Sequence, residues 1–464
     1  MIAGIERSRG AASVGGRGDG ADVSRLSRRR RQGWCGVVTP RVDGARLLAR
    51  LDAFAAIGGL PNGGVDRPAF SPSDQSARGL LAALATARGF HVAQDDVANL
   101  FIRRGADDGA PLLIGSHLDS QPSGGRFDGA LGTLAAFEVL EALEDHGAST
   151  ALSVELVAFA NEEGSRFLPG AMGSRAFAAR HLPDGATLDA AGIALDAAIA
   201  ATRASLPEAT QRPLGFPIAG YLELHIEQGP ILERAGLPIG AVEAIQGTRW
   251  LGVTMRGETS HAGTTPLGAR RDAVAALVAA LGRLQNDVMP GDDAARLTAG
   301  RLGSLPDSVN AVAREARCTL DLRHPSADRL AAMEAHARAV LGEAAAAHGC
   351  VAEIETLFAT PPTAFDPDMV AAVESAAARQ GLAARRMVSG AFHDALAIAA
   401  IAPTAMIFVP CRGGISHNEH EFVEPAASVA GAAVLLDATI DAAERLARRG
   451  AAAAGLNQRK RIGT

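Results

Sequence analysis

The chain has 464 residues, of which 48% are hydrophobic and 21% are charged, and its formal net charge at pH 7 is −6. This composition predicts a globular protein with two or more domains, and the absence of a basic excess argues against nucleic acid as a partner. The only lysine, Lys460, lies in the C-terminal tail, which excludes Schiff-base chemistry and a Walker-type phosphate loop, because both need a lysine in the site. No uninterrupted apolar run approaches the roughly 18 residues of a membrane span, so no membrane partner is expected.

Residues 1–40 are rich in Gly, Arg and Ser, which predicts a disordered extension or a gene start placed too early. No apolar stretch of signal-peptide length follows the basic run 28–31, so a secretory signal is not expected. The four cysteines have no Cys-x-x-Cys spacing, which favours a reducing compartment and leads us to expect a cytoplasmic protein. They are Cys35, Cys318, Cys350 and Cys411.

Residues 111–115 and 153–160 have the composition of buried strands, and residues 130–146 between them have the apolar spacing of a helix. A strand, a helix and a strand with short links predict a parallel, right-handed βαβ unit. Polar side chains cluster directly after both strands. Because ligands of open α/β sheets bind at the carboxyl ends of the strands, this placement predicts a site there.

Segment 115–129 (GSHLDSQPSGGRFDG) presents His117, Asp119 and Asp128 in a Gly-rich loop. Imidazole and carboxylate groups suit zinc, manganese or cobalt. Asp119 could hold the second ring nitrogen of His117, as acidic neighbours of metal ligands usually do. The alternative is that these polar residues only cap the following helix.

Segment 160–174 (ANEEGSRFLPGAMGS) places Glu162 and Glu163 at the end of an apolar strand. In an extended chain two adjacent carboxylates point in different directions, so one can bind a metal while the other handles protons. The alternative, an exposed helix face, is common for adjacent glutamates but fits poorly after a buried strand.

Segment 222–229 (LELHIEQG) carries His225 in a strand-like run, where a core histidine is the alternative to a ligand. Near the C-terminus, segment 413–421 (GGISHNEHE) carries His417 and His420, either of which could be ordinary surface. Together, the four segments supply enough His, Asp and Glu side chains for two metals that share a carboxylate, an arrangement that hydrolyses amides and esters.

Between residues 250 and 358 the pattern changes to the order βαββαβ, which predicts a ferredoxin-like α+β domain inserted into the α/β domain. Turn-rich or strand-end positions here carry His261, Asn310 and Arg323. Arg323 suits bidentate recognition of a substrate carboxylate, and a structural ion pair with a nearby aspartate is the alternative. The expected elements are strands at 250–256, 295–302, 312–323 and 351–358, and helices at 270–287 and 326–348.

After residue 361 the alternation of strands and helices resumes, with a strand near 404–409 and a helix over 426–448. The predicted organisation is an α/β catalytic domain in two parts with a hinge near Gly247 and near Thr360. Its boundaries are 41–247 for the first part, 248–359 for the inserted domain, 360–449 for the second part and 450–464 for a tail.

These segments, in this order, resemble the metal-dependent amidohydrolases of the carbamoylase branch of the aminoacylase and dizinc carboxypeptidase superfamily. That branch includes N-carbamoyl-L-amino-acid hydrolase, β-ureidopropionase and allantoate amidohydrolase. The resemblance extends from about residue 42 to about residue 448, and it is the set of motifs that is specific. The motifs are GSHLDSQPSGGRFDG, NEEGSRF, ELHIEQGPILE, SHAGTTP, SVNAV, DLRHPS and GISHNEHE.

The resemblance implies two divalent metal ions per subunit (Zn2+, Mn2+ or Co2+). It implies that His117 and His225 bind one ion, that Glu163 and His417 bind the other, and that Asp128 bridges them.

The resemblance also implies roles for the residues around the metals. Glu162 resembles the general base, and Asp119 resembles the residue that orients His117. His261 resembles a histidine that stabilises the oxyanion across the interface of a homodimer formed through the inserted domain. The residues that resemble substrate-binding groups are Gln228, Asn310, Arg323 and His393.

The implied reaction is hydrolysis of the ureido C–N bond of an N-carbamoyl α- or β-amino acid to the amino acid, CO2 and NH3. Allantoate amidohydrolase is the nearest alternative, and an aminoacylase or peptidase is a more distant one. One departure concerns the pocket: where relatives usually read SGAGHDA, this chain reads SGAFHDA, with Phe392 before His393 and Leu396 in place of a residue that is often polar.

Overall fold

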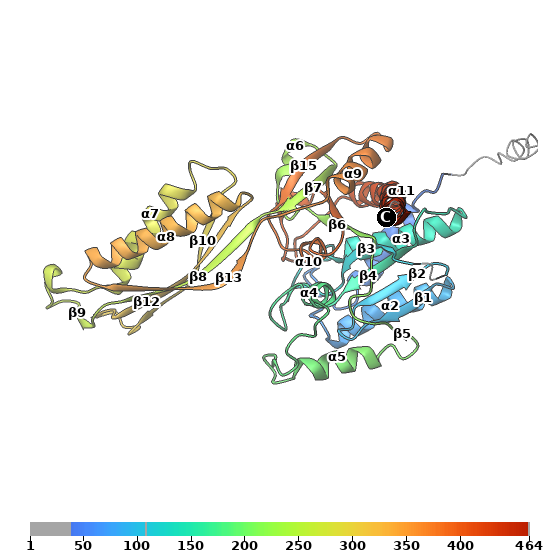
Figure 1. Cartoon of the computed structure of the whole chain (residues 1–464). Helices are drawn as coiled ribbons and strands as arrows, with labels where there is room; N and C mark the ends of the chain where they lie inside the picture. The colour runs from blue at the N-terminus through green and yellow to red at the C-terminus, as the bar shows by residue number, and fades with distance from the viewer. Residues whose placement is uncertain (1–38, 107–108, 463–464) are drawn as a thin grey trace, which may run out of the picture. The chain divides into compact units, whose positions relative to one another are not determined.

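The computed structural model describes residues 39–106 and 109–462. The predicted extension therefore lies outside the described residues up to residue 38. The described chain contains one large sheet, one four-stranded sheet and one two-stranded ribbon (Figure 1).

The large sheet has ten strands with the order β14-β7-β16-β6-β3-β4-β2-β1-β5, and β15 pairs with β7. These strands are β1 (His91–Gln94), β2 (Leu100–Arg103), β3 (Leu112–His117), β4 (Val154–Phe159), β5 (Thr210–Gln211), β6 (Gly220–Ile226), β7 (Ile239–Ile245), β14 (Thr363–Ala364), β15 (Ala384–Ser389) and β16 (Thr404–Val409). The accompanying helices are α1 (Gly44–Ala55), α2 (Pro72–Ala87), α3 (Ala130–Asp145), α4 (Met172–Ala179), α5 (Leu195–Ala204), α6 (Ile231–Ala235), α9 (Pro367–Arg379), α10 (Asp394–Ile398), α11 (Pro425–Ile462) and the short turn η3 (Arg412–Gly414).

Four neighbouring strands, β16, β6, β3 and β4, are parallel to one another. All of their residues are buried, as expected of parallel strands covered on both faces. The predicted βαβ unit is confirmed: α3 connects β3 to β4, and these strands pair in parallel from Leu112–Val154 to His117–Phe159. The carboxyl ends of all four strands consequently meet at one edge of the sheet.

The inserted domain has the predicted βαββαβ order. Its sheet has the order β10-β12-β8-β13 and is antiparallel, with α7 and α8 side by side (Figure 1). Its own hydrophobic core contains Leu251, Leu320 and Leu322. The elements are β8 (Gly247–Arg256), β9 (Ser260–His261), η2 (Leu267–Ala269), α7 (Ala273–Val288), β10 (Arg296–Leu305), β11 (Ala311–Val312), β12 (Glu315–His324), α8 (Ala327–Ala347) and β13 (Val351–Thr360).

Helix α11 extends to Ile462, beyond residue 448 where the sequence predicted its end. Four consecutive alanines at 451–454 explain the extension, because alanine has the highest helix propensity. Over Pro425–Ala452 this helix is long and apolar enough to cross a membrane, which the search for uninterrupted apolar runs did not anticipate. However, 56% of its most apolar stretch is buried inside the protein, and Leu435 and Leu436 belong to the core of the catalytic domain.

Candidate metal centre

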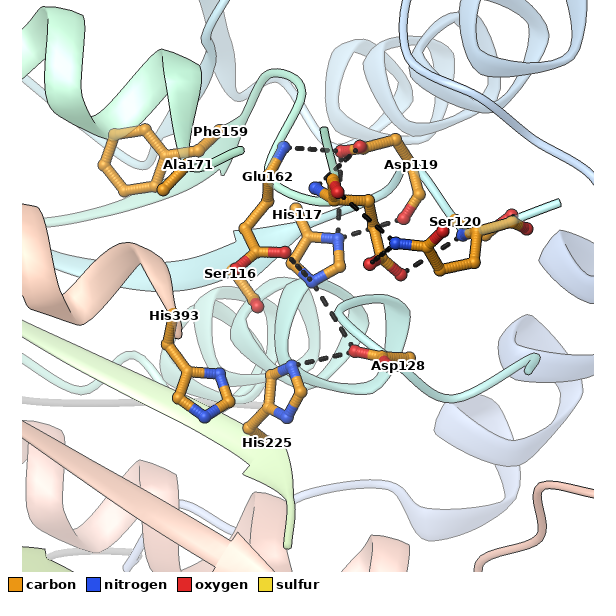
Figure 2. Close-up of polar contacts among 12 residues, drawn as sticks. Ser116, His117, Asp119, Ser120, Asp128, Phe159, Glu162, Ala171, His225 and His393 are labelled. Carbon is orange, nitrogen blue, oxygen red and sulfur yellow. Dashed lines mark hydrogen bonds and ion pairs between the residues drawn. The ribbon is translucent and has the colours of Figure 1, made fainter. Parts of the chain in front are cut away.

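The carboxyl ends of the four parallel strands bring together side chains that lie far apart in the sequence. His117 is the last residue of β3, and Glu162 and Glu163 follow β4. His225 is the second-to-last residue of β6, and His417 follows β16. Figure 2 shows the imidazoles of His117 and His225 directed towards Asp128. The cluster therefore lies at the carboxyl ends of the parallel strands, where the sequence predicted a site.

One group of possible metal ligands consists of His117, Asp128 and His225, all buried. The Nε2 atoms of His117 and His225 lie 3.6 and 3.0 Å from Oδ1 of Asp128. Neither nitrogen makes a hydrogen bond of acceptable geometry. A buried polar atom without a partner is costly, so two such nitrogens facing one carboxylate fit a cation between them.

A second group consists of Asp128, Glu163 and His417. Nε2 of His417 lies 3.3 Å from Oδ2 of Asp128 and 3.3 Å from Oε2 of Glu163. Asp128 therefore belongs to both groups, with one carboxylate oxygen facing each. Imidazole and carboxylate donors of this kind suit zinc, manganese and cobalt.

Close packing fixes His117 and the loop that holds Asp128. Gly129 has a φ of +63°, and a Cβ atom there would lie 2.3 Å from the His117 ring. A Cβ atom on Gly125 would lie 1.9 Å from the carboxyl carbon of Glu421. The Gly-rich motif is thus required so that the loop can approach both side chains.

Asp128 is held in place by four further contacts. Its Oδ2 atom accepts hydrogen bonds from Nε2 of Gln228 (2.8 Å) and Oγ of Ser416 (2.9 Å). The carboxylate of Glu421 accepts the backbone N–H groups of Phe127 (2.8 Å) and Asp128 (3.0 Å). Gln228, expected to bind substrate, donates to Asp128 in this structure.

Glu162 lies beside these groups, with Oε2 3.5 Å from Nε2 of His117. Burial raises the pKa of the Glu162 carboxyl well above its ordinary value, with further contributions from Asp394 and Glu163 and opposition from His117. Burial likewise raises the pKa of Glu163 to about 7, and Asp128 contributes. Crowded buried carboxylates are the environment in which bound cations are most favourable.

Asp119 acts through two different groups. Its backbone carbonyl oxygen lies 3.0 Å from Nδ1 of His117, whereas its carboxylate lies 3.8 Å away. The carboxylate accepts the backbone N–H groups of Glu162 and Glu163, both at 3.2 Å. Asp119 therefore contacts the second ring nitrogen of His117, as expected, and it does so through its backbone carbonyl.

His393 is buried beside the first ligand group. Its ring centroid lies 4.4 Å from that of His225, and its Nε2 atom lies 2.9 Å from Oγ of Ser389. Figure 2 shows the two rings adjacent. This placement is next to the metal ligands rather than next to Arg323.

The candidate residues of the inserted domain are not in contact with the metal ligands. His261 and Asn310 are exposed and adjacent, because β9 and β11 pair at His261–Ala311. His261 follows the ten residues of β8, which span roughly 30 Å at about 3.3 Å per residue. Among the described residues, no hydrogen bond or ion pair joins either side chain to the cluster; Oδ1 of Asn310 accepts from Ser308.

Arg323 forms the ion pair with a nearby aspartate that was the alternative to carboxylate recognition. Nε and Nη2 donate to the carboxylate of Asp321, at 3.0 and 2.8 Å. Nη1 donates to the carbonyl oxygen of Gly390, 2.8 Å away, in the loop that leads to His393. Arg323 therefore forms a structural ion pair with Asp321 and also contacts the catalytic domain.

Three residues that position the cluster were not found from the sequence. Gln121 donates to Glu163 (2.8 Å), while Ser416 and Glu421 act on Asp128 as described above. Each lies inside a motif that had been recognised for its histidines or acids. The available signal was a polar residue one to four positions from a predicted ligand. Such a residue does not reveal which atom its side chain contacts.

The comparisons with known proteins agree with this geometry. Residues 113–441 match the family model "Peptidase family M20/M25/M40". The chain is 36% identical to an N-carbamoyl-L-amino-acid amidohydrolase of Rhizobium meliloti, over 87% of this chain and 97% of that protein. It is 35% identical to an allantoate amidohydrolase of Escherichia coli, over 79% and 90%.

Among solved structures, a hydantoinase/carbamoylase family amidase of Burkholderia multivorans has 40% sequence identity and a TM-score of 0.81. The match covers 87% of this chain and 98% of that one. Sequence, fold and the arrangement of possible ligands point the same way: the chain belongs to the peptidase family M20/M25/M40.

Proposed function

We propose that this protein is a metal-dependent amidohydrolase that cleaves the ureido C–N bond of an N-carbamoyl amino acid. The observation that supports this most is the pair of ligand groups sharing Asp128, with Glu162 beside them. Relatives named as N-carbamoyl-L-amino-acid amidohydrolases match over most of the chain. Allantoate amidohydrolase is the second candidate, because relatives with that name match over similar lengths.

The proposed cofactors are two divalent ions, of zinc, manganese or cobalt. His117 and His225 would hold one, Glu163 and His417 the other, and Asp128 both. When bound, the ions would polarise the ureido carbonyl and lower the pKa of water towards about 7. This matters because a ureido carbonyl receives electron density from two nitrogens and is a weak electrophile.

Protein side chains would transfer the proton and bind the substrate carboxylate. The carboxylate of Glu162 would accept a proton from the attacking water and deliver it to the amino-acid nitrogen as the C–N bond breaks. The products of that step are the free amino acid and carbamic acid, which breaks down to NH3 and CO2. Arg323 would bind the substrate carboxylate through the N–H groups that Asp321 and Gly390 leave free, and Asn310, which lies beside His261, would reach the same carboxylate from a second subunit.

The imidazole of His261 would stabilise the negative charge that develops on the carbonyl oxygen. Since β8 separates it from the catalytic domain by roughly 30 Å, we propose that a second subunit supplies it across a homodimer built on the inserted domain. A cytoplasmic location is part of the same proposal.

The experiment that tests this function measures the release of ammonia and of the free amino acid by the metal-loaded protein, since hydrolysis of an N-acetyl amino acid releases no ammonia. The panel contains N-carbamoyl α-amino acids, N-carbamoyl-β-alanine, allantoate and an N-acetyl amino acid, each with added zinc, manganese or cobalt. We expect release from the N-carbamoyl acids and its loss on chelation. Exclusive use of allantoate would select the second candidate, and hydrolysis of the N-acetyl acid alone would contradict both.

A further inference from the structure

Three aromatic side chains form a cluster next to the metal centre, although aromatic residues make up only 4% of the chain. Trp250 comes from β8, Phe358 from β13 and Phe392 from the loop before α10. The ring centroids are 5.0 Å apart for Trp250–Phe358, 5.5 Å for Phe358–Phe392 and 6.3 Å for Trp250–Phe392. We call these three residues the aromatic wall.

The wall lies on the face of the inserted sheet that its helices leave open. Trp250 pairs with Asp321 across β8 and β12 and with Phe358 across β8 and β13. The side chains of Trp250, Asp321 and Phe358 therefore share one face of the sheet. The core residues Leu251 and Leu322 lie on the other face. Arg323 is two residues after Asp321 and therefore shares the face of the wall.

Phe392 connects the proposed carboxylate-binding group with the metal centre. On one side, the guanidinium carbon of Arg323 lies 5.6 Å from the centre of its ring. On the other side, the next residue, His393, makes an edge-to-face contact with His225, with ring centroids 4.4 Å apart. Phe392 therefore contacts Arg323 and directly precedes a residue that packs against a metal-ligand histidine.

Part of the wall remains uncovered. Trp250 is 37% exposed, and Phe358 and Phe392 are half-buried. Exposed aromatic surface beside a site is stabilised by apolar contact with a ligand. The carboxyl and ureido carbons of an N-carbamoyl α-amino acid are three covalent bonds apart, and the side chain branches from the carbon between them.

We infer that the aromatic wall binds the side chain of the substrate, and that the preferred substrate is an N-carbamoyl α-amino acid with a large apolar or aromatic side chain. This inference rests on the proposed function and narrows its substrate class. Apolar contacts of this size change specificity by about 10- to 200-fold. We therefore expect kcat/KM for N-carbamoyl-L-phenylalanine to exceed that for N-carbamoylglycine at least tenfold.

The test compares these two substrates in the wild type and in the variants Phe392→Ala, Phe392→Leu and Trp250→Leu. We expect Phe392→Ala to lower the phenylalanine-to-glycine ratio of kcat/KM about tenfold, mainly through KM. Hydrolysis of the glycine substrate should stay within a few-fold of wild type. Phe392→Leu and Trp250→Leu should give intermediate ratios, since leucine retains part of the apolar surface.

A matched control exists elsewhere in the chain. Phe216 packs against Phe101 and Phe177, with Arg212 over its ring, so it reproduces three rings and an arginine without contacting a site residue. Phe216→Ala should leave the substrate ratio unchanged. Circular dichroism and metal content establish that each variant is folded and loaded.

Two results would overturn the inference while leaving the proposed function intact. One is a wild type that hydrolyses both substrates with equal kcat/KM. The other is a Phe392→Ala variant that loses the same factor on both substrates, because the wall would then only join two parts of the protein. A wild type that hydrolyses no N-carbamoyl amino acid would refute the proposed function, and the inference with it.

Discussion

The metal-ligand groups lie at the edge of the large sheet, whereas His261 and Asn310 lie on the inserted domain, and the two sets differ in how completely they are assembled. At the edge of the large sheet, His117, Asp128 and His225 are buried, and the Nε2 atom of each histidine lies within 3.6 Å of Oδ1 of Asp128. On the inserted domain, His261 and Asn310 are exposed, and within the described part of the chain their side chains form hydrogen bonds only with nearby residues. One sheet alone assembles the first set, whereas the second set needs another arrangement of domains or another subunit to act with it.

The largest effect is expected from removing the carboxylate that both ligand groups share. Asp128→Ala should lose both metals together and lower ammonia release below detection, because one carboxylate serves both groups. Metal analysis by mass spectrometry checks the loss. Ser416→Ala, which removes one hydrogen bond to Asp128 but no ligand, is the control, and retention of one full metal equivalent in Asp128→Ala would contradict the shared role.

The next effect concerns the exposed set. His261→Ala should lose about 10²- to 10³-fold in turnover, as expected for one donor to a developing oxyanion. If the partner subunit supplies His261, mixing this variant with Glu162→Gln and allowing exchange creates mixed dimers in which one site has both residues. Activity should then return.

The matched control is a mixture of Glu162→Gln with Asp128→Ala. Both changes lie in the catalytic domain, so no mixed dimer contains a complete site and no activity should return. Verified exchange without recovery in the His261→Ala mixture would mean that His261 acts within its own chain or has no role.

Arg323 links the two regions and should give a smaller effect. Charge-assisted hydrogen bonds contribute about 1.5–3 kcal/mol, so Arg323→Met should raise KM for N-carbamoyl acids about 10- to 150-fold. KM for the matching carboxamides should change little. Arg317→Met alters an exposed arginine on the same strand and serves as the control. Equal losses on acids and carboxamides would make Arg323 purely structural.

The smallest effect concerns a residue that acts through another. Glu421→Gln retains a hydrogen-bond acceptor for the N–H groups of Phe127 and Asp128 but removes its charge, so metal affinity should fall about tenfold. A competition titration with a chelating dye measures the change. Glu424→Gln, three residues away in an exposed ion pair with Arg412, should leave affinity unchanged; equal affinities in both variants would remove Glu421 from this role.

The same contrast explains what the sequence could predict. The parallel strands are recognisable in the sequence as apolar runs. The rule that ligands bind at the carboxyl ends of such strands predicted a site near His117, Glu162 and Glu163, and these residues do lie at the strand ends. The βαββαβ order of the inserted domain was likewise readable, because each element has its own periodicity.

Contacts between segments distant in the chain were not readable. The hydrogen bond from Gln228 to Asp128 joins residues 100 positions apart, and that from the backbone N–H of Asp128 to Glu421 joins residues 293 apart. Glutamine beside a predicted ligand is equally compatible with binding substrate and with holding the ligand. Asp119 was recognised as a neighbour of His117, but only the backbone path shows that its carbonyl makes the contact.

The central claim is that Glu162 transfers the proton at a metal centre assembled by the large sheet. The most direct test measures metal content and kcat together in Glu162→Gln with an N-carbamoyl amino acid as substrate. We predict the metal content of the wild type and a kcat lower by about 10²- to 10⁴-fold, because ligation survives while proton transfer fails. A fully metal-loaded Glu162→Gln enzyme with a kcat close to that of the wild type would contradict the account.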